Sequence, residues 1–307
     1  MTTSPSTQPT EQQAKSTIGL VGAAVAVTTW GVSGVIAKNI DMGGAAIAAY
    51  RFSVYAVVMS FVGWRAGVRL NRQVLRDTLW GGIALGLDVA LFFTAVKLTT
   101  IVNATMIGAL QPIVVSIVAH RVFGEHIAKR DIVLGMVALA GVAVVVMGST
   151  GAPEWNLAGD MAAIGALAAW SAYFVTNRMA KDKVNPRQFT IGTAFYTGLI
   201  NIPIALAFGQ SLANPSSQSW VWLLVLTFGS GVMGHELMNW SLRKIPLWLG
   251  STFTLLVPVV ASAAAWMFLD EPLNGIQMAA MAVVLGALGL IFAGQSEVLN
   301  RRRPLRR

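Results

Sequence analysis

The chain contains no cysteine and only three histidines in 307 residues. The lack of cysteine excludes disulfides, thiolate catalysis and zinc–thiolate sites, and three histidines offer little for a metal centre, so we predict no metal site. Charged residues make up only 11% of the chain, against about 25% in a typical soluble domain. Because so little charge cannot cover a soluble globule of this size, a soluble enzyme is excluded.

Uncharged stretches of the length of a membrane helix, about 20 mostly apolar residues, recur along the chain. The longest, residues 188–234, has no charge and is divided in two by turn residues around position 212. The pattern predicts an all-α integral membrane protein of ten transmembrane helices. Their expected ranges are 16–38, 43–64, 77–97, 99–122, 131–149, 157–178, 188–209, 218–241, 246–269 and 273–295.

The net charge of +9 has a topological explanation. If the amino terminus is cytoplasmic, 19 of the 22 lysines and arginines fall on the cytoplasmic side, as the positive-inside rule requires. We therefore expect a multi-pass protein of the bacterial plasma membrane with both termini in the cytoplasm. Membrane lipids are expected partners, since the arginines after residue 300 can contact anionic headgroups. Nucleic acid is not an expected partner, because the basic residues are dispersed over the loops.

Residues 106–148 and 252–294 align without a gap at a constant offset of 146. Pro112 corresponds to Pro258 and Gly148 to Gly294, although chance similarity of Ala- and Gly-rich sequence is the alternative. Each half then holds five helices, and an odd number inverts the second half relative to the first. Inverted repeats are a recurrent plan of secondary transporters. The predicted division is a disordered cytoplasmic tail (1–15), a first five-helix repeat (16–149), a second, inverted repeat (150–295) and a basic cytoplasmic tail (296–307).

These features resemble the EamA family of the drug/metabolite transporter superfamily. The resemblance covers about residues 16–295 and is carried by Ala109–Pro112 with Phe123–Glu125, by Leu255–Pro258 with Leu269–Glu271, and by Arg51 in the second helix. It implies a ten-helix fold in which the fifth and tenth helices lie outside a central cavity. It also implies export of amino acids, other metabolites or toxic compounds, often coupled to protons, although some members take up or exchange solutes.

Three charged positions lie at membrane depth, where a charge costs roughly 2.5–3.5 kcal/mol on insertion scales. Asp88 and Glu236 occupy nearly equivalent places in the two repeats, and Arg51 lies in the second helix. The two acids are candidates to carry protons, with His235 as a relay, or to bind a cationic substrate group. The alternative is structural pairing of Asp88 with Arg51 or Lys97, and for Arg51 we favour a structural pair.

Other intramembrane residues are candidates to line the transport path. Trp30 and Trp170 lie in the middle of the first helix of each repeat and either pack between helices or line a pocket. Asn103 and Gln111 are polar groups of the fourth helix that can face the same cavity.

Pro112 and Pro258 break the backbone hydrogen bonding of the fourth and ninth helices. They are either hinges or static kinks. Glu125 and Glu271, near helix ends, are expected to cap the following helix or pair with a base.

No segment matches a nucleotide-binding GxxxxGK[ST] loop or a hydrolase motif, so we expect no enzyme activity and no cofactor. The sequence favours a secondary transporter of a small organic solute, working by alternating access with proton-coupled export. A facilitator or exchanger without proton coupling is the first alternative, and a non-transporting scaffold the second. The sequence leaves the substrate open, and both a monomer and a homodimer are compatible with it.

Overall fold

The computed structural model describes residues 8–99, 101–150, 156–213, 215–270 and 272–301. These residues form helices and connecting turns. Ten helical stretches are long and apolar enough to cross a membrane, which confirms the predicted all-α membrane fold. Five fall in each half of the chain, so the ten spans form two five-helix repeats of opposite direction.

The spans of the first repeat follow the expected ranges closely. They are α1 (Gln8–Lys38), α2 (Gly44–Arg65), α3 (Arg72–Leu98), a fourth span made of α4 (Ile101–Gly108) and α5 (Gln111–Phe123), and α6 (Lys129–Thr150).

The second repeat is less regular. It contains α7 (Leu157–Met179), α8 (Pro186–Ala207), an eighth span of α9 (Ser217–Leu226), a π-helix (Thr227–Glu236) and α10 (Leu237–Ser241), a ninth span of α11 (Leu247–Thr252), a 3₁₀ turn (Phe253–Leu255) and α12 (Leu256–Leu269), and finally α13 (Gly275–Arg301).

Both terminal helices extend beyond the membrane segments. α1 begins at Gln8, inside the stretch 1–15 that we expect to be a disordered tail, and α13 continues to Arg301, inside the basic tail. Residues 8–15 are rich in Gln, Glu, Ala and Lys, which favour helix. Adding residues to an existing helix avoids the cost of nucleation. The outermost residues, 1–7 and 302–307, lie outside the described residues.

Local sequence explains several helix ends. Asn71 accepts a hydrogen bond from the Val74 amide at the start of α3, and Asn185 forms a capping box with Gln188 at the start of α8. α5 and α12 end at Gly124 and Asp270, both in the left-handed conformation (φ 65° and 54°). These two residues are 146 positions apart, so the repeats share the backbone geometry of this helix end although only one has the glycine that this geometry favours.

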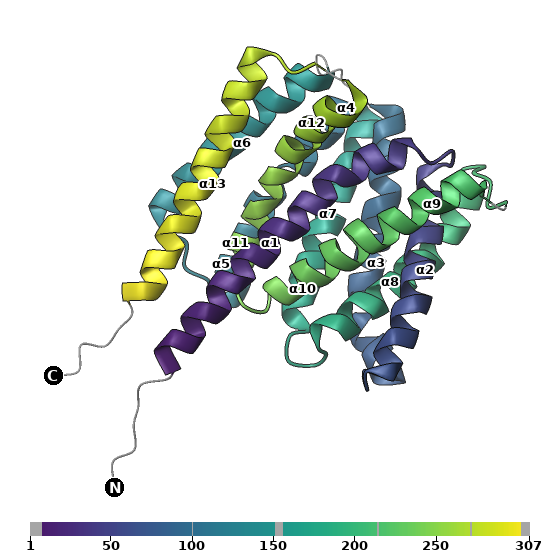
Figure 1. Cartoon of the computed structure of the whole chain (residues 1–307), viewed down its shortest axis with the longest axis horizontal. Helices are drawn as coiled ribbons and strands as arrows, with labels where there is room; N and C mark the ends of the chain where they lie inside the picture. Colours follow the sequence, from purple (N-terminus) through teal and green to yellow (C-terminus); the bar gives the residue numbers. More distant parts are fainter. Residues whose placement is uncertain (1–7, 100, 151–155, 214, 271, 302–307) are drawn as a thin grey trace, which may run out of the picture.

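The helices pack in pairs that the repeat relates to each other. α3 packs along α7, and α1 correspondingly packs along the π-helix and α10, while α2 packs on α8 and α6 on α13. Figure 1 shows α6 and α13 together at one side of the bundle. This peripheral position is the one that the family resemblance implies for the fifth and tenth helices.

α8 approaches α2 and α3 closely because small residues lie between them. A Cβ atom added to Gly198 would lie 2.9 Å from the backbone nitrogen of Ser53. Thr197 and Asn201 each donate a hydrogen bond of 3.3 Å to a backbone oxygen of α3, at Gly82 and Gly86. Close approach of this kind is the usual means of helix association in membranes.

Candidate functional site

Five ring side chains from four spans meet in the interior, and we call them the aromatic cluster: Trp30, Phe52, Trp170, Tyr173 and His235. The ring centroid of His235 lies 5.2 Å from that of Trp30, 5.7 Å from that of Phe52 and 6.0 Å from that of Tyr173. The repeat-related Trp30 and Trp170 meet edge to face at 5.2 Å. The structure therefore brings together three residues that the sequence analysis proposed, Trp30, Trp170 and His235. They meet where the first repeat contacts the second.

The π-helix places His235 in this cluster. A π-helix is rare and is frequent at functional sites, and this one contains Gly229, Gly231 and Gly234. Gly234 lies directly against the indole of Trp30, where a Cβ atom would overlap Trp30 Nε1. The glycines thus allow α1 to approach the eighth span at the level of the cluster.

Several polar atoms around the cluster are buried without a hydrogen-bond partner in the described part of the chain. They are Trp30 Nε1, Arg51 Nε, the Tyr55 hydroxyl and His235 Nδ1. Phe52, Tyr55, Tyr173 and His235 line a narrow cavity here together with Leu85 of α3. Buried polar groups in proteins are nearly always satisfied, so these atoms are candidates to bind a polar ligand or water.

Arg51 lies beside the cluster, with its guanidinium carbon 4.9 Å from the centre of the Phe52 ring. Among the described residues it forms no salt bridge, and the pair with Asp88 considered from the sequence is not formed. The side chain of Lys97, the other partner considered, lies outside the described residues. The guanidinium is therefore available to an anionic group.

Asp88 lies one helical turn after Leu85, which lines the narrow cavity. It shares a face of α3 with Leu91, three residues further on, and Leu91 packs on Gly165 of α7. Helical spacing therefore places Asp88 on the side of α3 that faces α7, one turn along the helix from the narrow cavity. No described side chain forms a salt bridge with it.

Glu236, the repeat counterpart of Asp88, has a different environment. Its carboxylate accepts a hydrogen bond of 2.7 Å from Arg187 Nε, with exposed side-chain fractions of 40% for Arg187 and 20% for Glu236. The pair borders a cavity of about 660 Å³ between α2, α8 and the eighth span. The two acids therefore differ: Asp88 has no ion-pair partner among the described residues, and Glu236 is paired with Arg187 at a wide cavity.

The two polar candidates of the fourth span lie in separate places. Asn103 donates a hydrogen bond of 3.1 Å to Asp160, in the first turn of α7. Gln111 accepts a bond of 3.1 Å from Thr254 of the ninth span, and its Nε2 is buried without a partner in the described residues. The structure thus places Asn103 at a helix start and Gln111 at the contact between the fourth and ninth spans.

The fourth and ninth spans are interrupted just before their prolines. α4 ends at Gly108 and α5 begins with Gln111-Pro112, while Pro258 lies in the first turn of α12 directly after the 3₁₀ turn. Since proline cannot donate a backbone hydrogen bond, each proline lies where the regular bonding restarts. Regular α-helix is thus interrupted beside the proline in both repeats.

Comparison with known proteins decides the family. A model of the EamA-like transporter family matches the chain twice, over residues 17–147 and 157–293. The chain belongs to the EamA-like transporter family. It is accordingly a membrane transporter and not an enzyme.

The EamA-like transporter has several distant relatives. It is 26% identical to an uncharacterized transporter, YyaM, of Bacillus subtilis, over 78% of this chain and 82% of that protein. It is 24% identical to the threonine/homoserine exporter RhtA of Escherichia coli K12, over 80% and 81%, and to a probable amino-acid metabolite efflux pump of the same strain, over 87% and 92%. A crystal structure with 18% identity superposes with a TM-score of 0.77, covering 95% of this chain and all of the other, which shows the shared fold.

Some residues of this EamA-like transporter were not identified from the sequence. Tyr55 follows the candidate Arg51 by four residues and Tyr173 follows the candidate Trp170 by three, so helical spacing was a usable signal. From the sequence, Arg187 contributes only to the excess of basic residues on the cytoplasmic side. Nothing in the sequence connects it with Glu236, 49 residues away.

Glu125 acts across the two repeats. It accepts hydrogen bonds from the backbone amides of Leu247 (2.9 Å) and Trp248 (3.2 Å) and from Arg178 (2.9 Å). It therefore caps α11 of the second repeat and pairs with a base, whereas the sequence suggested a cap on the following helix. Glu271 lies outside the described residues.

The Arg187–Glu236 pair predicts a reciprocal effect of charge reversal. We expect Arg187→Glu and Glu236→Arg each to lower the unfolding temperature of the purified transporter, and the double exchange to recover part of the loss. Because the pair is partly exposed, the coupling free energy should be about 0.5–1 kcal/mol. Arg76→Glu, an exposed reversal on α3, is the control. Strictly additive losses in the double variant would show that the pair does not contribute.

Proposed function

We propose that this protein is a secondary active transporter that exports an amino acid or a related small metabolite by alternating access, driven by protons. Support comes from the relatives, two of which bear names for amino-acid or amino-acid-metabolite export. The observation that carries the proposal is the central site, where the unpaired guanidinium of Arg51 adjoins a ring cluster at the junction of the repeats. A transporter without proton coupling is the alternative that the experiments below separate.

The chemistry of the central site suits a zwitterion. Arg51 can bind a carboxylate, and a charge-assisted hydrogen bond of this kind is stronger than a neutral one. Asp88, one turn of α3 from Leu85 of the narrow cavity, is the candidate for the opposite charge that an ammonium group needs, and the aromatic cluster provides apolar surface beside Arg51. Trp30 Nε1, the Tyr55 hydroxyl and His235 Nδ1 are then the groups that complete the hydrogen bonds of the solute.

The two acids have separate tasks in this proposal. Asp88, which has no ion-pair partner among the described residues, exchanges protons or the ammonium of the solute. Glu236 is held by Arg187 at the wide cavity, and protonation there would release the pair. The interrupted spans at Pro112 and Pro258 are symmetric places for the bending that alternating access requires.

We also propose that the protein lies in the bacterial plasma membrane with both termini in the cytoplasm, as the distribution of basic residues indicates. α1 begins and α13 ends at the same end of the bundle (Figure 1), as an even number of spans requires. The chain has no cysteine of its own, so single introduced cysteines report orientation. An impermeant maleimide should label Ser211→Cys in intact spheroplasts and Lys183→Cys only after permeabilisation. The opposite pattern would invert the topology.

Transport itself is tested with labelled threonine or homoserine in proteoliposomes. The intact protein should carry at least one of them, and Arg51→Gln should raise KM by about tenfold or more because a charge-assisted hydrogen bond is lost. Arg65→Gln removes the same charge at the end of the same helix, outside the cluster, and should leave KM unchanged. If neither amino acid is carried, the same assay with other zwitterions and with organic cations identifies the class. Absence of any flux would contradict transport.

Proton coupling is tested with an imposed pH gradient. Acidifying the lumen should stimulate uptake by the intact protein, since protons leaving the vesicle drive the solute inward. Asp88→Asn or Glu236→Gln should abolish the stimulation while leaving exchange of labelled for unlabelled solute. Asp77→Asn is the control, because Asp77 lies in the first turns of α3 and binds Gln73. Stimulation that persists in both variants would refute coupling by these acids, and exchange without stimulation in the intact protein would identify an exchanger.

A further inference from the structure

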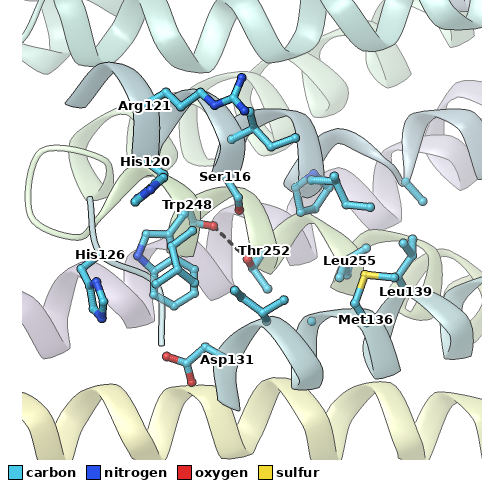
Figure 2. A pocket seen from close by; sticks show the side chains of 17 residues that line it. Ser116, His120, Arg121, His126, Asp131, Met136, Leu139, Trp248, Thr252 and Leu255 are labelled. Atoms are coloured by element: carbon cyan, nitrogen blue, oxygen red, sulfur yellow. Dashed lines mark hydrogen bonds between the residues drawn. The ribbon is translucent and has the colours of Figure 1, made fainter. Parts of the chain in front are cut away.

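A cavity of about 580 Å³ lies between α5, α6 and α11, apart from the aromatic cluster. We call it the α5–α6 groove. Figure 2 shows its lining, with Ser116, His120 and Arg121 on one side and Asp131 on the opposite side. None of the residues that border the aromatic cluster lines it, so the groove is not an extension of the central site.

The groove exists because two consecutive helices diverge. α6 packs mainly on α13, while α5 packs on α11 and α7, and α5 and α6 make little contact with each other. The walls are apolar and open: Ile117 is 50% exposed, Ile132 51% and Met136 51%. Because these side chains belong to spans of a membrane protein, the medium that reaches them is the hydrocarbon of the bilayer.

The length of the groove matches one leaflet. Its lining on α5 extends from Pro112 to Arg121, a rise of roughly 14 Å at 1.5 Å per residue. The hydrocarbon core of a bilayer is about 30 Å thick, so the groove reaches from near its centre to the headgroup level. Gly135 of α6 leaves further space in the groove, since apart from its chain neighbours and the backbone of its own helix no described atom lies within 4 Å of the position of a Cβ there.

Basic side chains stand at the outer end of the groove. His120, Arg121 and His126 all line it there, and no salt bridge engages Arg121 within the described ranges. The one carboxylate of the lining, Asp131, accepts a hydrogen bond of 2.7 Å from Gln295 of α13, so a polar partner already binds it on the side away from α5. The mouth therefore offers a free guanidinium at the depth of lipid phosphates.

We propose that the α5–α6 groove binds a phospholipid with an anionic headgroup, such as phosphatidylglycerol. One acyl chain lies along Ile117, Ile132 and Met136, and the phosphate is bound by Arg121 with the two histidines beside it. Basic pockets between transmembrane helices on the cytoplasmic side bind anionic headgroups in this way. The lipid comes from the cytoplasmic leaflet if the proposed orientation is correct, and its binding does not depend on which solute is carried.

Native mass spectrometry of the purified full-length transporter, with palmitoyl-oleoyl phosphatidylglycerol or the matching phosphatidylcholine added, tests the proposal. We expect one tightly retained phosphatidylglycerol and weaker retention of phosphatidylcholine. Arg121→Gln should reduce the affinity for phosphatidylglycerol about fivefold, the effect of one basic side chain near an anionic lipid, and should remove the preference. Gly135→Leu should reduce the retention of both lipids, because the added side chain fills the groove.

Matched variants separate the groove from general effects. Arg76→Gln removes one basic residue at the same end of the bundle, and Gly286→Leu adds the same side chain at an open glycine of α13. Both should bind phosphatidylglycerol as the unaltered protein does. Equal retention of the two lipids, or equal loss in the control variants, would overturn the proposal.

Two competitors identify other occupants. If inorganic phosphate alone displaces the lipid, or if threonine does so in the unaltered protein, the groove is an ion or solute site and the lipid proposal fails. Lipid retention is measured without flux, so a failure of the lipid proposal would leave the proposed transport function untouched. Conversely, Arg51→Gln should weaken transport and leave lipid retention unchanged.

Discussion

The structure depends on one constraint: inside a bilayer, every backbone amide and carbonyl must be satisfied by protein or by enclosed water. Irregular backbone therefore needs polar partners within the protein or enclosed water. The π-helix of the eighth span packs against α1, α2 and α8, and the interruptions before Pro112 and Pro258 lie part-way along the fourth and ninth spans. The π-helix thus brings His235 into contact with Trp30 of the other repeat, where we propose the solute site.

The two repeats share a framework but not a set of side chains. Trp30 and Trp170 are true counterparts and contact each other, and Gly124 and Asp270 end equivalent helices with the same left-handed backbone. The acids break the symmetry, since Glu236 has an arginine partner and Asp88 has none among the described residues.

Sequence reasoning succeeded where a property is averaged over many residues. Hydropathy over 20-residue stretches located the ten spans, and a constant spacing of 146 identified the repeats. It was least informative about single contacts between distant segments. The π-helix was not anticipated, because Thr227–Glu236 has the composition of an ordinary glycine-containing helix. Arg187 was not paired with Glu236, and Asn103 was assigned to the cavity although it binds Asp160. The π-helix, the Arg187–Glu236 pair and the Asn103–Asp160 hydrogen bond all depend on which helices become neighbours. The pattern of residues within one helix does not determine its neighbours.

Glu125 gives the architecture a mechanical property. The Glu125 carboxylate accepts hydrogen bonds from two backbone amides at the start of α11 and forms a salt bridge with Arg178 at the end of α7. It therefore connects the loop after α5 to two spans of the second repeat. α11 cannot separate from that loop without breaking the two hydrogen bonds that its backbone amides donate to this carboxylate. Separation of α11 from the loop after α5 and separation of α7 from that loop are therefore coupled, because both contacts share one carboxylate. This end of the bundle opens cooperatively.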